Sequence, residues 1–200
     1  MTEDLHQAKR PVSALLAGPY GHPLHPVLVN VPIGAWVAAS VFDLASHVVP
    51  DGEFLARGAW WLIAIGVLGA LAAALVGFLD FMAIPSGTTA FRTAVVHLSL
   101  NLLVTGGYIA GFLWRRAGGL GTAAVPWGPL VLSLVCLAVL GVSGFLGGML
   151  AFRYGVRVAD EGTQAEGFTR ASLGRRPAGS QRTASHGDID EPVPPQTGRR

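Results

Sequence analysis

The sequence predicts an all-α polytopic membrane protein: a four-transmembrane-helix bundle built from two helical hairpins, with a disordered C-terminal tail. Three observations predict this fold class. Apolar residues make up 51% of the 200 residues and charged residues only 13%. The charges avoid four stretches, each longer than the ~20 residues that cross a ~30 Å hydrocarbon core. A sheet is nearly excluded, because open sheet edges cannot face lipid.

The four apolar stretches define a membrane domain over residues 21–158. They are expected to cross the bilayer at residues 27–49, 59–82, 93–114 and 127–152. Residues 1–20 form a polar lead-in without a visible cleavable signal, since the first apolar run is long enough to span. Residues 159–200 contain few aliphatic side chains and cannot bury enough surface to offset their ordering entropy, so we expect them to be disordered.

Basic residues near the helix ends predict the orientation. With four spans, the N-terminus, the 83–92 loop and the C-terminus share one side of the membrane. That side carries five basic residues, Lys9, Arg10, Arg92, Arg153 and Arg157. The other side carries three, Arg57, Arg115 and Arg116. The excess favours cytoplasmic N- and C-termini. The Arg-, Ala- and Gly-rich composition suggests a bacterial protein, hence the cytoplasmic (inner) membrane.

The first span is preceded by the motif Gly21-His22-Pro23-Leu24-His25-Pro26. His22 and His25 each precede a proline, which disfavours the α conformation, so both are predicted to be extended. Pro26 fits the first position of a helix, which makes His25 a plausible cap at the helix mouth. An interfacial turn with a capping histidine and a ligand site both remain open.

The third span begins with a second motif, Arg92-Thr93-Ala94-Val95-Val96-His97. His97 lies five residues past Arg92, hence ~7–8 Å into the helix. Asn101 follows at i+4 on the same face. Ionisable and polar side chains at this depth are expensive and count as site hypotheses. Their other interpretation is an interhelical hydrogen bond.

The tight loop between the second and third spans joins two opposite charges. Asp80 ends one helix and Arg92 begins the next. An Arg–carboxylate pair is geometrically favoured and is expected to clamp the hairpin. Ser86, Thr88 and Thr89 are candidate caps of the third helix.

The far end of the first span carries Asp43 and His47, which can hydrogen-bond at i, i+4. Asp43 lies deeper than an interfacial charge should, so it needs a partner. An aromatic belt at the membrane surface is expected from Trp60, Trp61, Trp114 and Trp127.

A weak internal repeat suggests a duplicated hairpin. The second span ends Gly77-Phe78-Leu79 and the fourth ends Gly144-Phe145-Leu146. The first and third spans each begin near a histidine, with an asparagine, Asn30 or Asn101, about one turn deeper. Chance similarity between apolar stretches is the alternative.

Several spaced motifs carry a family resemblance over about residues 22–158. They are His22-Pro23-Leu24-His25-Pro26 with Asp43-Leu44, Phe78-Leu79-Asp80-Phe81 with Ile84-Pro85, Arg92-x-Ala94-x-x-His97-x-x-x-Asn101, and Gly144-Phe145-Leu146-Gly147-Gly148. Together they resemble an uncharacterised bacterial membrane family, domain of unknown function 2231. Some relatives carry a Rieske-type or cytochrome c domain, which implies a place in electron transfer. The tail of this chain has no cysteine and no C-x-x-C-H, so such a partner would be a separate protein.

Three functions fit these observations, and the sequence does not decide whether the protein is an enzyme. The first is a non-enzymatic membrane component whose polar cytoplasmic end docks a partner or small solute. The alternative is a redox subunit in which His25 and His97 bind a b-type haem, Asn101 orients an imidazole and Arg92 pairs with a propionate. A quinone head-group site is a close variant. The third is proton or small-solute transport, although no continuous polar path crosses the middle.

Other classes are disfavoured. No P-loop, zinc-ligand helix, nucleophile elbow or triad spacing is present, so nothing suggests a hydrolase. The small net charge of +2 is scattered, which gives no case for nucleic acid. The expected partners are the lipid bilayer and either a separate redox protein or a second copy. The single cysteine, Cys136, is expected to pack as a small apolar residue.

Overall fold

The computed structural model describes residues 7–9, 23–119 and 124–166. Across these residues the chain is helical and has no strand. Four helical stretches are long and apolar enough to cross a membrane: Leu24–Ala45, Glu53–Met82, Thr89–Ala117 and Trp127–Arg153. The expected fold class is confirmed. His22 lies outside the described residues, as does most of the polar lead-in.

The helices extend past the predicted apolar stretches at most ends. The first span consists of α2 (Leu24–Leu28) and α3 (Asn30–Ala45), and the second is α4 (Glu53–Met82). The second hairpin is formed by α5 (Thr89–Ala117) and α6 (Trp127–Gly148). Helix α6 continues into the short π-helix η3 (Met149–Arg153). The hydroxyl of Thr88 accepts a hydrogen bond from Phe91 N at 3.1 Å, so one of the expected caps of α5 is confirmed.

The predicted tail is not wholly irregular. Its first part contains the short helix α7 (Glu161–Glu166). The backbone N–H of Thr163 donates to Asp160 Oδ1 at 2.9 Å, which caps this turn. Residues 167–200 of the predicted tail lie outside the described part.

The prediction that His25 is extended is wrong, because it lies within α2. The extended conformation falls on Pro23 instead, which has φ −69° and ψ 128° and starts the helix. Pro26 is then the third residue of α2. Its missing N–H is one of the first four, which have no acceptor inside a helix, so the proline does no harm there. Val29 separates α2 from α3.

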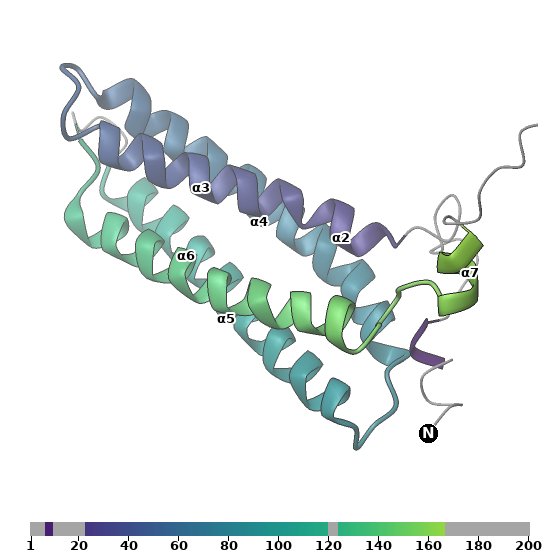
Figure 1. Ribbon diagram of the computed structural model, residues 1–200. Coiled ribbons are helices and arrows are strands. Elements are labelled where there is room, and N and C mark those ends of the chain that lie inside the picture. The colour runs from purple at the N-terminus through teal and green to yellow at the C-terminus, as the bar shows by residue number, and fades with distance from the viewer. Residues whose placement is uncertain (1–6, 10–22, 120–123, 167–200) are drawn as a thin grey trace, which may run out of the picture.

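Two helical hairpins pack side by side and begin at the same end of the molecule (Figure 1). The contacts between α3 and α4 form the first hairpin and those between α5 and α6 the second, while α4–α5 and α3–α6 contacts join the two. A buried core lies between them, formed by Trp36, Ala39, Ala59, Ile63, Val104, Tyr108 and Cys136. The expectation that Cys136 packs in the interior is confirmed. Large aliphatic side chains such as Leu68 and Leu75 face outward, as lipid contact requires.

The contacts of the two hairpins repeat at fixed spacings. Trp36 Nε1 donates to the carbonyl of Ile63 at 3.4 Å, and Tyr108 Oη donates to the carbonyl of Ser133 at 3.2 Å. Tyr108 lies 72 residues after Trp36, and Ser133 lies 70 after Ile63. The two rings stack on each other with centres 4.1 Å apart. Equivalent residues therefore meet across a pseudo-twofold axis, which supports a duplicated hairpin.

The repeat has a different register from the one predicted. A Cβ on Gly77 would lie 2.6 Å from the ring of His25, and a Cβ on Gly147 would lie 3.0 Å from the ring of His97. Gly77 thus corresponds to Gly147, one helical turn beyond the expected Gly144. Asn30 is not the counterpart of Asn101 either, because its exposed amide donates only to local carbonyls.

Candidate functional site

Polar side chains gather at two ends of the bundle. We call the end where α2 and α5 begin the histidine end, after His25 and His97. We call the opposite end, where α3 and α5 finish, the ion-pair end, after Asp43 and Arg115. Each pair joins equivalent positions of the two hairpins, 72 residues apart.

At the histidine end, the ring of His25 crosses from α2 to α4. Its Nδ1 lies 2.9 Å from the carbonyl oxygen of Ala73, and the ring covers Gly77, where no side chain blocks it. A carbonyl oxygen only accepts hydrogen bonds, so Nδ1 carries the hydrogen. In the neutral ring, Nε2 therefore keeps its lone pair.

His97 repeats this arrangement in the second hairpin. Its Nδ1 lies 2.8 Å from the carbonyl oxygen of Ser143, and the ring covers Gly147. The side-chain amide of Asn101 donates to the carbonyl of His97 and to Ser143 Oγ, both at 2.8 Å. These two bonds use both amide hydrogens, so the 3.2 Å approach of Asn101 Nδ2 to Nε2 is not a further bond. Nε2 of His97 is left with its lone pair.

The two partly buried rings lie next to each other in an edge-on arrangement, with centres 6.4 Å apart and planes at 86°. A metal ion bound by two imidazole nitrogens at about 2.0 Å each sets the ring centres roughly 6 Å apart. Residues 7–9, 23–119 and 124–166 contain no group of three His, Cys, Asp or Glu side chains that could hold a metal. The pair therefore offers two ligands and no more from the described residues.

The predicted clamp between Asp80 and Arg92 is wrong. Asp80 pairs instead with Arg157, whose Nε lies 2.9 Å from Oδ1. Arg157 folds back beneath the histidine end in a left-handed conformation, with φ 59°, and its backbone N–H donates to the carbonyl of Ala8. Arg92 points out from the first turn of α5 and is exposed. Arg157 takes the carboxylate because the chain after η3 returns to the end of α4.

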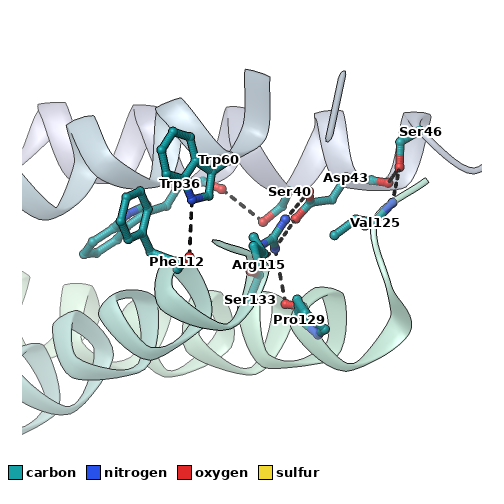
Figure 2. Close-up of polar contacts among 10 residues, drawn as sticks. All are labelled: Trp36, Ser40, Asp43, Ser46, Trp60, Phe112, Arg115, Val125, Pro129 and Ser133. Carbon is teal, nitrogen blue, oxygen red and sulfur yellow. Dashed lines mark hydrogen bonds and ion pairs between the residues drawn. The ribbon is translucent and has the colours of Figure 1, made fainter. Parts of the chain in front are cut away.

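The ion-pair end is held by a bidentate pair (Figure 2). Arg115 Nη1 and Nη2 donate to Asp43 Oδ1 and Oδ2, both at 2.7 Å. Asp43 is 0% exposed and Arg115 5%. Arg115 Nη2 also donates to Ser133 Oγ at 3.0 Å and to the carbonyl of Pro129 at 3.3 Å. This geometry makes the strongest class of protein ion pair.

The expectation that Asp43 bonds His47 is wrong, because Arg115 occupies both carboxylate oxygens of Asp43. Arg115 itself was expected to be an interfacial charge. His47 stacks on Trp127 instead, with ring centres 4.5 Å apart. The hydroxyl of Ser46 ties this end further, donating to the Asp43 carbonyl and accepting from Val125 N.

One predicted belt residue is also misplaced. Trp60 is buried, stacks on Phe112 and donates to its carbonyl at 3.2 Å (Figure 2). Trp61, Trp114 and Trp127 remain more than half exposed, as a belt requires.

Sequence reasoning missed four residues that shape the two ends: Gly147, Ser143, Arg115 and Arg157. The repeat spacing is the signal that finds three of them. An offset of 72 from Asp43 gives Arg115, and an offset of 70 from Ala73 and Gly77 gives Ser143 and Gly147. Arg157 has no counterpart in the first hairpin.

The family model described as "Predicted membrane protein (DUF2231)" matches residues 21–160. The chain belongs to this family. The match covers both hairpins and both ends, so the resemblance read from the spaced motifs is confirmed, and the chain is a membrane protein with four candidate spans. No curated protein and no solved structure matches it.

Proposed function

We propose that this DUF2231 protein is a membrane redox subunit that binds a b-type haem between His25 and His97. The observation that carries the proposal is the neighbouring pair itself. The ring centres of two imidazoles on equivalent helices lie 6.4 Å apart, and each Nδ1 is fixed by a main-chain carbonyl. A hydrogen bond from Nδ1 to a carbonyl oxygen orients the ring and leaves Nε2 as the nitrogen that binds a metal. A bound haem would supply one-electron transfer.

The number of protein ligands favours haem over a bare ion. Zinc takes three or four protein ligands, whereas haem iron needs only two beyond the porphyrin. The histidine tautomers bear on the quinone variant. Quinone oxygens accept hydrogen bonds, yet each Nε2 here is itself an acceptor. The pair therefore suits a Lewis acid better than a quinone.

The neighbouring residues take supporting roles in the proposal. Asn101 and Ser143 fix the backbone and ring of His97 through the bonds described above. Arg92 remains the candidate partner of a propionate, since its exposed side chain forms no ion pair with the described residues. The electron donor or acceptor would be a separate protein or a second copy.

We infer that the histidine end faces the cytoplasm of a bacterial inner membrane. Arg115 and Arg157 are buried in ion pairs. Without them, four basic residues remain at the histidine end and two at the ion-pair end. They are Lys9, Arg10, Arg92 and Arg153 at the first, and Arg57 and Arg116 at the second. By the positive-inside rule, this excess supports cytoplasmic N- and C-termini.

A non-enzymatic component that docks a partner or solute is the second candidate. One observation favours it: each histidine already joins the two helices of its own hairpin through a hydrogen bond, which is a complete structural role. Transport gains less support, because the buried core around Trp36, Ile63, Val104 and Tyr108 lies between the two polar ends.

The test is the visible absorption spectrum of the full chain, expressed with haem precursor and purified in detergent. Oxidised and dithionite-reduced samples should show a Soret band and sharp reduced α and β bands. His97→Ala should lose them while the protein still inserts in the membrane. His47→Ala, a histidine at the opposite end, is the matched control and should keep them. A featureless wild-type spectrum at full yield contradicts the haem proposal and leaves the docking role.

A further inference from the structure

We infer that His25 is the exchangeable ligand of the pair, and that a small neutral molecule such as carbon monoxide replaces it on the iron while His97 stays bound. The inference rests on the proposed function, because it concerns the same site. It comes from a difference between two halves that the repeat makes equivalent. The two histidines occupy matching positions but are not equally held.

His97 is held by a network on two long helices. It lies in the 29-residue helix α5, and its ring bonds the carbonyl of Ser143 on α6. Asn101 connects the His97 carbonyl to Ser143 Oγ, and Ser143 is fully buried. Moving this ring away from the axis disrupts bonds among three residues and the packing of α5 on α6.

His25 is held by much less. Its helix, α2, has five residues, none of them buried, and Val29 separates it from α3. The ring has one hydrogen bond among the described residues, to the carbonyl of Ala73. Ala73 stands where the second hairpin has Ser143, and Val29 stands where it has Asn101, so both members of the supporting network are missing. Segments with few buried contacts open at low free energy.

The exchange balances without an electron or proton donor. The coordination bond between iron and His25 Nε2 breaks, and its electron pair returns to the imidazole. The incoming molecule forms the new bond with its own lone pair. His25 keeps its Nδ1 hydrogen throughout. A neutral ligand is expected because a charge at this depth would need a partner, and a small one because His25 lies against α4 at Gly77.

The experiment is a carbon monoxide titration of the reduced full-length protein in detergent, followed by the shift of the Soret band. Wild type should bind the gas. His25→Ala should keep its haem, change to a five-coordinate spectrum and bind carbon monoxide about 10–100-fold more tightly, as expected if the open state is about 1–10% populated in wild type. His97→Ala should lose the haem. His47→Ala, a histidine at the opposite end, should keep the haem and the wild-type affinity for carbon monoxide.

The outcomes separate the two proposals. A wild-type protein without a Soret band overturns both the haem site and the exchange. A normal haem spectrum that carbon monoxide does not shift overturns the exchange alone. So does an affinity unchanged in His25→Ala, or a haem that is lost in His25→Ala and kept in His97→Ala. The wild-type titration needs no variant, so the inference stays testable if a substitution prevents folding.

Discussion

The two ends of this bundle differ in the residues that occupy equivalent positions of the two hairpins. At both, equivalent residues from the two hairpins meet across the pseudo-twofold axis. At the ion-pair end they are complementary, and Asp43 and Arg115 satisfy each other through two bonds of 2.7 Å. At the histidine end they are identical, and no hydrogen bond joins His25 directly to His97 in the described structure. One end is closed by side chains that bind each other, whereas at the other each histidine binds a main-chain carbonyl of its own hairpin.

The largest expected effect is at the ion-pair end. Asp43→Ala leaves the Arg115 charge buried without its partner, which should lower the free energy of unfolding by about 3–5 kcal/mol. Unfolding in detergent, followed by circular dichroism, measures the loss. The double variant Asp43→Leu with Arg115→Met is the control and should recover most of the stability. A single variant as stable as wild type would show that this end does not hold the hairpins together.

A smaller effect is expected from the glycine beneath His25. In Gly77→Ala the new Cβ would lie 2.6 Å from His25 Nδ1, so the ring must leave the Ala73 carbonyl. We expect a loss of about 1–3 kcal/mol and a disturbed histidine site. Gly144→Ala is the matched control, because nothing lies within 4 Å of its Cβ. Equal behaviour of the two variants in thermal melts would contradict the assigned repeat register.

The network around His97 should contribute less again. Ser143→Ala removes the hydroxyl that accepts from Asn101 but keeps the carbonyl that fixes His97. A loss of about 1 kcal/mol is expected, typical of interhelical hydrogen bonds in membranes. The same unfolding assay applies. A loss of stability as large as that of Asp43→Ala would mean that the main structural role lies at the histidine end, so the proposed difference between the two ends would not hold.

The smallest effect is expected from an exposed ion pair near the ion-pair end. Arg57 and Glu53 lie 2.6 Å apart on α4, but their side chains are 56% and 47% exposed. Arg57→Ala should cost about 0.3–0.5 kcal/mol, an effect that added salt reduces. Melting curves at low and high salt would measure it. A salt-independent loss of several kcal/mol would mean that burial does not explain why the Asp43–Arg115 pair contributes more to stability than the Glu53–Arg57 pair.

Much of the fold could be predicted from the sequence because it depends on local chemistry. The length of each apolar stretch predicts a span, Thr88 marks the start of α5, and the i, i+4 spacing puts His97 and Asn101 on one face. The pairing of the histidine motifs at one end also follows from the order of the spans. These inferences need no knowledge of which helix packs against which.

The polar partners could not be predicted in the same way. Sequence proximity favours His47 as the partner of Asp43 and Arg92 as the partner of Asp80. The two carboxylates instead bind Arg115 and Arg157, far downstream. A carboxylate inside the bundle takes whichever cation the packing brings to it. The pseudo-twofold arrangement reveals Arg115, whereas Arg157 has no counterpart in the first hairpin and follows only from the return of the chain after η3. Asn30 was expected to be the counterpart of Asn101. The residue 72 positions before Asn101 is Val29, so Asn30 is one residue out of register and points away from the axis.

The two repeat spacings differ by two residues, 72 between α3 and α5 but 70 between α4 and α6. The first hairpin therefore has two more residues between its histidine and its glycine than the second, yet both rings lie in the same place. The difference is absorbed where each hairpin turns at the ion-pair end, far from the histidines. The exposed residues 48–51 of the first turn are therefore a suitable position for an inserted epitope or glycosylation acceptor that reports which side of the membrane it occupies.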